Sequence, residues 1–130
     1  EALQASRDTL GDTHPSTLDS INNLGMLLQD RGDLKGAEPL YREALQARRE
    51  TLGDTHPDTL VSINNLGMLL EDRGDLEGAA PLLSEELDAC AKRCGMDHKE
   101  TQGSAKNLIK LLQTMGRDSE AAQLASEFKC

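Results

Sequence analysis

The feature that most constrains this chain is an internal repeat with a period of 42 residues. When residues 43–84 are placed beneath residues 1–42, 33 of the 42 positions are identical. A third, degenerate copy follows, because His98 and Gly116 fall 42 residues after His56 and Gly74. Self-similarity at a fixed period of this size predicts a solenoid, in which each unit buries its apolar face on its neighbours.

Each period carries the signals of two helices. Pro15 and Pro57 suit the first position of a helix, where the missing N–H is not needed. Gly32 is expected to end this helix in a left-handed conformation, and Asp33 to cap the next one. Between these signals, apolar residues recur at three- and four-residue spacing, which is typical of a helix with one buried stripe. In the first copy they are Leu18, Ile21, Leu24 and Leu28.

The second helix of each period has a matching apolar stripe but contains a proline. Pro39 and Pro81 each remove one backbone hydrogen bond inside this helix. We expect a tolerated irregularity there and not a break. The predicted fold is all-α, with antiparallel helix pairs at 15–52, 57–94 and 98–128, preceded by a truncated second helix at 1–10.

Composition argues against several classes of protein. The net charge of -9 is opposite to what general nucleic-acid or membrane-surface binding needs, which is clustered Lys and Arg. No apolar run approaches the roughly 20 residues that span a bilayer, and no signal-peptide pattern is present. Three cysteines fit a reducing compartment better than a disulfide framework. We therefore expect a soluble, cytoplasmic protein.

The repeat also carries a family resemblance. The first copy resembles the tetratricopeptide pattern through Ile21, Leu24, Gly25, Leu28, Ala37, Tyr41 and Ala44. The 42-residue period, with the motifs HP-x-TL and INNLG, is similar to the cargo-binding repeats of kinesin light chains. The second copy departs from the pattern at Glu86, where a small residue is usual. The resemblance implies a right-handed superhelix of helix pairs, an α-solenoid, with the first helix of each pair on a concave face.

By this resemblance, the concave face binds a peptide or extended segment of a partner protein. The expected partner-binding residues are Asn22 and Met26 in the first copy, Asn64 and Met68 in the second, and Lys106 and Lys110 in the third. An Asn amide both donates and accepts hydrogen bonds, and Met offers an adaptable apolar contact. The two lysines suit an acidic peptide or a C-terminal carboxylate.

A plainer interpretation of the same residues stays open. The asparagines then bond within the solenoid, and the lysines are only solvated. The adjacent Asn23, Asn65 and Asn107 recur in all three copies, so we expect them to serve the repeat itself. In the third copy Ile109 replaces Gly and Ala125 replaces a large residue, which favours a C-terminal cap.

Metal binding and catalysis are not expected. His14, His56 and His98 recur once per repeat, which favours a structural role, and successive repeats hold them too far apart to share an ion. Cys90, Cys94 and His98 are spaced four apart, but Gly95 is expected to end the helix between them. No nucleophile motif, phosphate loop or HExxH motif is present. We therefore predict a protein without cofactors that is not an enzyme.

The predicted function is that of a protein–protein interaction module with an adaptor or scaffold role. Residues 1–84 carry 15 acidic and 7 basic residues, so a basic or mixed partner fits the first two repeats. The alternative is a structural array that associates with itself, which the near-identity of the first two copies favours. A homodimer through the truncated helix at 1–10 belongs to this alternative.

Overall fold

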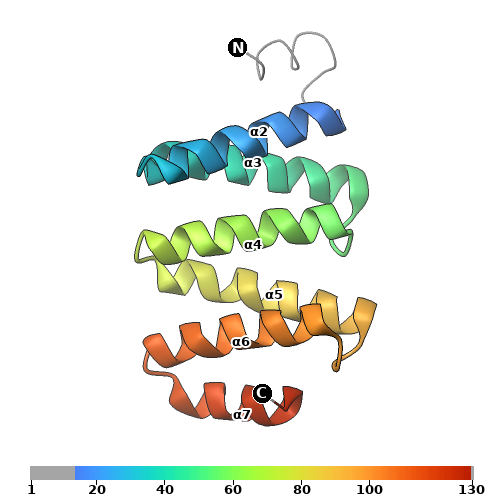
Figure 1. The fold of residues 1–130 in the computed structure, drawn as a ribbon, viewed down its shortest axis with the longest axis vertical. Coiled ribbons are helices and arrows are strands. Elements are labelled where there is room, and N and C mark those ends of the chain that lie inside the picture. Colours follow the sequence, from blue (N-terminus) through green and yellow to red (C-terminus); the bar gives the residue numbers. More distant parts are fainter. Residues whose placement is uncertain (1–13, 130) are drawn as a thin grey trace.

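A computed structural model describes residues 14–129, which form six helices. These are α2 (Pro15–Asp30), α3 (Leu34–Leu52), α4 (Pro57–Asp72), α5 (Leu76–Cys94), α6 (Lys99–Thr114) and α7 (Asp118–Phe128). Each helix packs against the next one along the chain, and the stack runs from α2 at one end to α7 at the other (Figure 1). The predicted all-α solenoid of antiparallel helix pairs is confirmed, whereas the helix expected at 1–10 lies outside the described residues.

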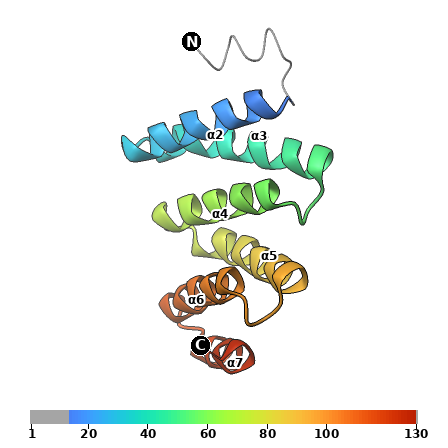
Figure 2. The same cartoon turned by 45° about the vertical axis from the view of Figure 1, so that its right-hand side comes forward.

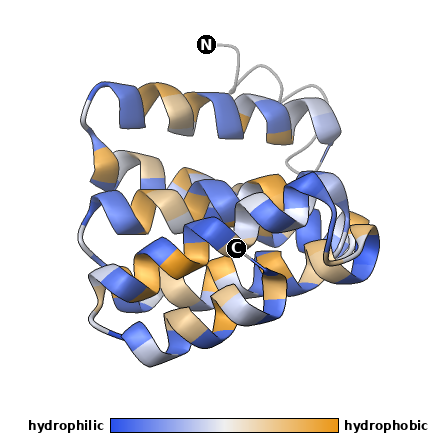
Figure 3. Ribbon diagram, turned by 60° about the horizontal axis from the view of Figure 1, so that its bottom comes forward, coloured by the Kyte–Doolittle hydropathy of each residue, from blue (hydrophilic) through white to orange (hydrophobic). Residues whose placement is uncertain are grey.

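The helix axes turn progressively along the stack. In Figure 2, α7 is seen nearly end-on while α2 and α3 run across the view. Hydrophobic and hydrophilic segments alternate along every helix (Figure 3), as expected for helices that bury one stripe against their neighbours. None of the described helices is both long and apolar enough to span a membrane.

The three histidines cap the first helix of each pair. His14, His56 and His98 each have an extended backbone, and each Nδ1 accepts a hydrogen bond from the backbone N–H two residues later, at 3.0–3.1 Å. A proline follows His14 and His56 at the first helical position. The repeated His therefore has the structural role that its periodicity predicted, because it satisfies one otherwise free N–H at a helix start.

The second helices begin and end as the local signals predict. The Asp33 carboxylate accepts from the N–H of Gly36, and Asp75 makes the same bond in the next pair, so both are N-caps. Gly32 has φ = +85°, a conformation that costs little without a side chain. Pro39 lies inside α3, which continues unbroken to Leu52. The proline is thus tolerated, as predicted.

Close packing within a pair depends on glycine. A Cβ added at Gly25 would lie 2.8 Å from Cε1 of Tyr41, so a larger residue at this position would collide with the buried tyrosine ring. The tyrosine is almost fully buried, and its hydroxyl donates to Gln29 at 2.8 Å. In the third pair the sizes are exchanged, because Ile109 stands at the glycine position and Ala125 at the tyrosine position.

Candidate functional site

Two grooves lie between the first helices of successive pairs. The α2/α4 groove is lined by Pro15, Leu18, Asp19, Arg48, Thr51, Leu52 and Asp58. The α4/α6 groove is lined by Pro57, Leu60, Val61, Asn64, Asn65, Glu86, Cys90, Arg93, Glu100, Gly103, Ser104 and Asn107. Six residues of the second set stand 42 positions after residues of the first, so the two grooves are equivalent places in the repeat.

The two grooves differ in size and in the residue that fills them. The α2/α4 groove has a volume of about 120 Å³, whereas the α4/α6 groove has about 410 Å³. Arg48 of α3 lines the smaller groove. The equivalent residue of α5 in the larger groove is Cys90. A long side chain that folds into the groove leaves less space than a short one, so this substitution contributes to the difference.

The Arg48 guanidinium is buried, with 5% of the residue exposed. One terminal nitrogen, Nη1, donates to the Ser62 hydroxyl at 2.8 Å and to the Asp58 carbonyl at 3.2 Å. The other, Nη2, pairs with the Asp19 carboxylate at 2.9 Å. Arg48 thus joins α3 to both first helices, and its charge is compensated within the chain.

The α4/α6 groove contains an acidic side chain without a basic partner. Glu86 of α5 is half-buried, and its Oε1 accepts a 3.0 Å hydrogen bond from the Asn64 side chain. Among residues 14–129, no other group hydrogen-bonds to this carboxylate or forms an ion pair with it. Burial raises the pKa of Glu86, and the Asn64 bond opposes that shift.

Cys90 lies deeper in the same groove. Its Sγ is 3.7 Å from the Ser104 hydroxyl, which is the counterpart of the Ser62 hydroxyl that Arg48 binds. Burial raises the pKa of the Cys90 thiol, the bond with Ser104 opposes this, and the nearby Glu86 charge adds to it. The thiol is therefore kept protonated, a state that does not favour nucleophilic chemistry.

The structure gives the predicted asparagines internal partners. Asn22 is 8% exposed, donates to Met26 Sδ at 3.6 Å, and accepts from Asn65 at 2.9 Å. Asn64 lines the α4/α6 groove but uses its amide to bind Glu86. Asn65 joins α4 to α2, which confirms its expected role, whereas Asn23 and Asn107 are exposed and have no such side-chain bond among residues 14–129. A partner-binding role for Asn22 and Asn64 stays a prediction.

The other predicted residues are more accessible. Met26 is 46% exposed and Met68 is half-buried. Lys106 and Lys110 are exposed on α6, and among residues 14–129 neither forms an ion pair. Sequence reasoning missed Arg48, and it considered Cys90 only as a potential metal ligand. Glu86 was visible only as a departure from the usual small residue.

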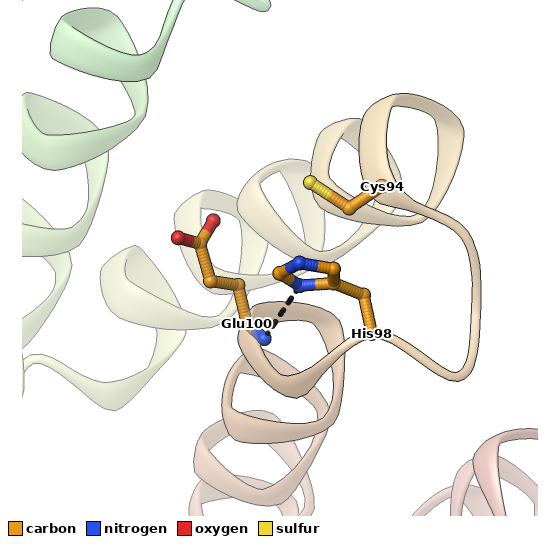
Figure 4. A group of neighbouring side chains, drawn as sticks. All are labelled: Cys94, His98 and Glu100. Atoms are coloured by element: carbon orange, nitrogen blue, oxygen red, sulfur yellow. Dashed lines mark hydrogen bonds between the residues drawn. The ribbon is translucent and has the colours of Figure 1, made fainter.

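One cluster of potential metal ligands lies beside the α4/α6 groove. The ligand atoms of Cys94, His98 and Glu100 are within 4.8 Å of one another (Figure 4). The His98 Nδ1, however, accepts the Glu100 N–H, so the proton of the neutral ring is on Nε2. A metal bound at either nitrogen would displace that proton or the cap. The arrangement therefore serves the start of α6 better than it serves an ion.

Comparison with known proteins identifies the repeat. A family model for the tetratricopeptide repeat matches residues 1–45 and 16–92. The chain belongs to the tetratricopeptide repeat family. A search of curated proteins finds no significant match. Tetratricopeptide repeats are in general protein–protein interaction modules, and this coarse function applies to the chain.

Solved structures confirm the resemblance to kinesin light chains. The chain is similar to a putative kinesin light chain with nearly identical repeats from Podosopora anserina, at 26% identity and a TM-score of 0.90 over 97% of this chain and 60% of that one. A variant of the same protein aligns at 25% identity and a TM-score of 0.89, over 97% of this chain and 59% of that one. The chain therefore spans about three fifths of these relatives.

A more distant structure supports the fold alone. BtubC (BKLC) from P. vanneervenii aligns with a TM-score of 0.87 and 22% identity, over 98% of this chain and 51% of that one. The stacked helix pairs of the tetratricopeptide repeat are thus shared at low sequence identity.

Proposed function

We propose that this chain binds a peptide or extended segment of a partner protein along its first helices α2, α4 and α6, in an adaptor or scaffold role. The α4/α6 groove carries the proposal, because it is an open volume of about 410 Å³ between two first helices. The exposed Asn107 amide in this groove suits a peptide backbone, and Val61, 49% exposed, offers an apolar contact.

The remaining surface of the first helices fits an extended segment of mixed character. Met26 and Met68 supply adaptable apolar contacts at equivalent positions of α2 and α4. Lys106 and Lys110 on α6 suit an acidic residue or a C-terminal carboxylate. The proposed setting is the cytoplasm, in agreement with the free thiols of Cys90 and Cys94.

Selection from a random peptide library, followed by fluorescence polarisation, tests this function. The variant Val61→Arg places a bulky charge at the groove and is expected to weaken selected peptides at least about tenfold, because it removes an apolar contact and blocks the site. The control Ala122→Arg introduces the same arginine at an exposed position of α7. Equal loss in both variants, or none in either, would contradict the proposed face.

The alternative is a structural array that associates with itself. The observation that favours it is the identity of 33 of 42 positions between the first two copies, since recent duplicates need no separately adapted site. Light scattering coupled to gel filtration, under reducing conditions and over a concentration series, separates the two. A constant monomer leaves the first helices free for a peptide. A dimer that is disrupted by Val61→Arg would replace the peptide proposal.

A further inference from the structure

The α2/α4 groove shows how a guanidinium fits between two first helices. Arg48 meets a serine hydroxyl and a backbone carbonyl of α4 through one nitrogen, and a carboxylate of α2 through the other. The first two acceptors come from positions 62 and 58. Their counterparts in the α4/α6 groove are the hydroxyl of Ser104 and the carbonyl of Glu100, and both residues line that groove.

The α4/α6 groove keeps these acceptors, and among residues 14–129 no arginine bonds to them. Cys90 takes the place of Arg48 and reaches only the Ser104 hydroxyl. The space left open by the shorter side chain is part of the 410 Å³ volume. The α4/α6 groove therefore has the hydrogen-bond acceptors of a guanidinium site, and no guanidinium of the described residues occupies it.

The compensating negative charge is also present, at a different position. Val61 stands where the first groove has Asp19, so the carboxylate that pairs with Arg48 is lost. Glu86 stands where the first groove has Ala44, and it brings a carboxylate into the groove from α5. One oxygen of Glu86 accepts from Asn64, and a second oxygen remains for another donor.

We propose that the α4/α6 groove binds an arginine side chain of the partner segment. This proposal rests on the proposed function and specifies what the segment must contain. A guanidinium offers five donors in a fixed plane, so it can bind Ser104, the Glu100 carbonyl and Glu86 together. Leu60 and Val61 supply apolar contacts for the methylene stem.

Arginine fits better than lysine for a geometric reason. The acceptors belong to different helices, α5 and α6, and they include a hydroxyl, a carbonyl and a carboxylate. A planar fork reaches several such acceptors at once, whereas an ammonium is a compact and strongly hydrated point charge. Arg93 also lines the groove and is exposed at the end of α5, which makes it a resident competitor for Glu86.

NMR titration with short peptides tests the proposal directly. The probes are blocked pentapeptides Gly-Ala-X-Ala-Gly with arginine, citrulline or norleucine at X. Citrulline has the shape of arginine without its charge. Backbone resonances of Asn64, Glu86 and Ser104 report on the α4/α6 groove. The arginine peptide is expected to bind there at least about tenfold more tightly than the citrulline peptide, because charged hydrogen bonds contribute more than neutral ones.

Three variants assign the preference to the groove. Glu86→Gln is expected to reduce the affinity for the arginine peptide to that for the citrulline peptide, while Glu127→Gln, the same change at an exposed site of α7, leaves it unaltered. Cys90→Arg should fill the groove as Arg48 fills the other, and abolish binding. Arg93→Thr restores the residue of the first groove and should keep or increase the affinity. A loss of affinity in Arg93→Thr would mean that an acidic residue binds here, and would overturn the proposal.

The outcomes separate this inference from the proposed function. Equal binding of the arginine, citrulline and norleucine peptides in the groove overturns the arginine site and leaves peptide binding intact. Shifts confined to Met26, Met68 or Lys110 have the same meaning, because the segment then lies elsewhere on the first helices. If no peptide from the library or from this series shifts any residue of α2, α4 or α6, both proposals fail.

Discussion

The α2/α4 and α4/α6 grooves come from the same repeat and have opposite chemistry. In the first, Arg48 occupies the space between the helices, and its charge is paired with Asp19. In the second, Cys90 leaves the space open and Glu86 adds an acidic group. The contrast involves three pairs of equivalent residues, which are Arg48 and Cys90, Ala44 and Glu86, and Asp19 and Val61. The two grooves share the same arrangement of helices but differ in the side chains that line them.

The polar groups around the two grooves also differ in how many hydrogen bonds they form within the chain. In the first, the Asn65 amide bonds Asn22 of the preceding repeat, and the Thr59 hydroxyl donates to the Arg48 carbonyl. In the second, Thr101 is the counterpart of Thr59, and its buried Oγ1 has no partner among residues 14–129. The α4/α6 side therefore contains one polar group that the described part of the chain leaves without a hydrogen bond, and this group is fully buried.

Removing Arg48 should have the largest effect on stability. Arg48→Cys gives the first groove the residue of the second, and it is expected to lower the free energy of unfolding by about 2–3 kcal/mol, because a buried, multiply bonded charge is lost. Urea unfolding followed by circular dichroism measures this. Arg42→Ala breaks an ion pair on an exposed arginine and should cost less than about 0.5 kcal/mol. Similar losses in both variants would show that the buried guanidinium has no special role.

The converse change should stabilise the chain. Cys90→Arg places an arginine near Ser104 and Glu86, and it is expected to raise the free energy of unfolding by about 1 kcal/mol through charge-assisted hydrogen bonds. The same substitution in a Glu86→Ala background lacks the carboxylate and should give a smaller gain, seen in the same unfolding experiment. A loss in both backgrounds would mean that the second groove cannot accommodate an internal arginine.

The Glu86 carboxyl should make the stability of the chain depend on pH. Its pKa is raised in the folded state by burial, so the folded chain holds this proton more tightly than the unfolded chain. The contribution of this proton to the free energy of unfolding is fully present below the ordinary Glu pKa of about 4.3. It is lost as the pH rises through the raised pKa of Glu86 in the folded state. Glu86→Gln replaces the buried carboxylate with a neutral amide, so the variant should be more stable than the wild type at pH 7 by up to about 1 kcal/mol.

Chemical denaturation of the two chains at several pH values checks this sign. The stability difference between Glu86→Gln and the wild type should shrink toward zero in acid. The charged neighbours that face the group, Arg93 on α5 and Glu100 on α6, are unchanged in the variant. A difference that stays constant with pH would assign the effect to packing and not to ionisation.

The smallest expected effect compares two equivalent asparagines. Asn65→Ala removes the bond to Asn22 and should cost about 1 kcal/mol. Asn107→Ala is made at an exposed residue of the α4/α6 groove and should change stability by less than about 0.5 kcal/mol. Thermal unfolding of the Asn65→Ala and Asn107→Ala variants measures both changes in stability. Equal costs would indicate that Asn107 has a structural bond of the same kind.

The fold could be predicted because its signals are local or periodic. Proline at the start of a first helix, glycine at its end and aspartate at the next start each act within a few residues. The 42-residue period then fixes how the pairs stack. The role of the histidines was predicted as structural, but the bond from Nδ1 to the N–H two residues later was not, because Ser, Thr, Asp and Asn are the usual caps.

The candidate site could be predicted only in part. First-helix residues such as Met26 and Lys110 follow from the family pattern, and the structure leaves both exposed. The contrast between the grooves depends on Arg48 and Cys90, which belong to second helices and extend beneath the first helix of the next pair. Helical periodicity gives the face of a residue on its own helix, and it does not give the space left by a neighbouring repeat.

The packing of each helix on its chain neighbours has a consequence for how such arrays diversify. A unit can be duplicated without disturbing contacts elsewhere, because few contacts extend past the next helix. Each added unit creates one more groove, and substitutions at a few of its positions change whether that groove is self-filled or open. A lineage of such proteins can therefore acquire a new specificity by copying a closed groove and then changing a few residues.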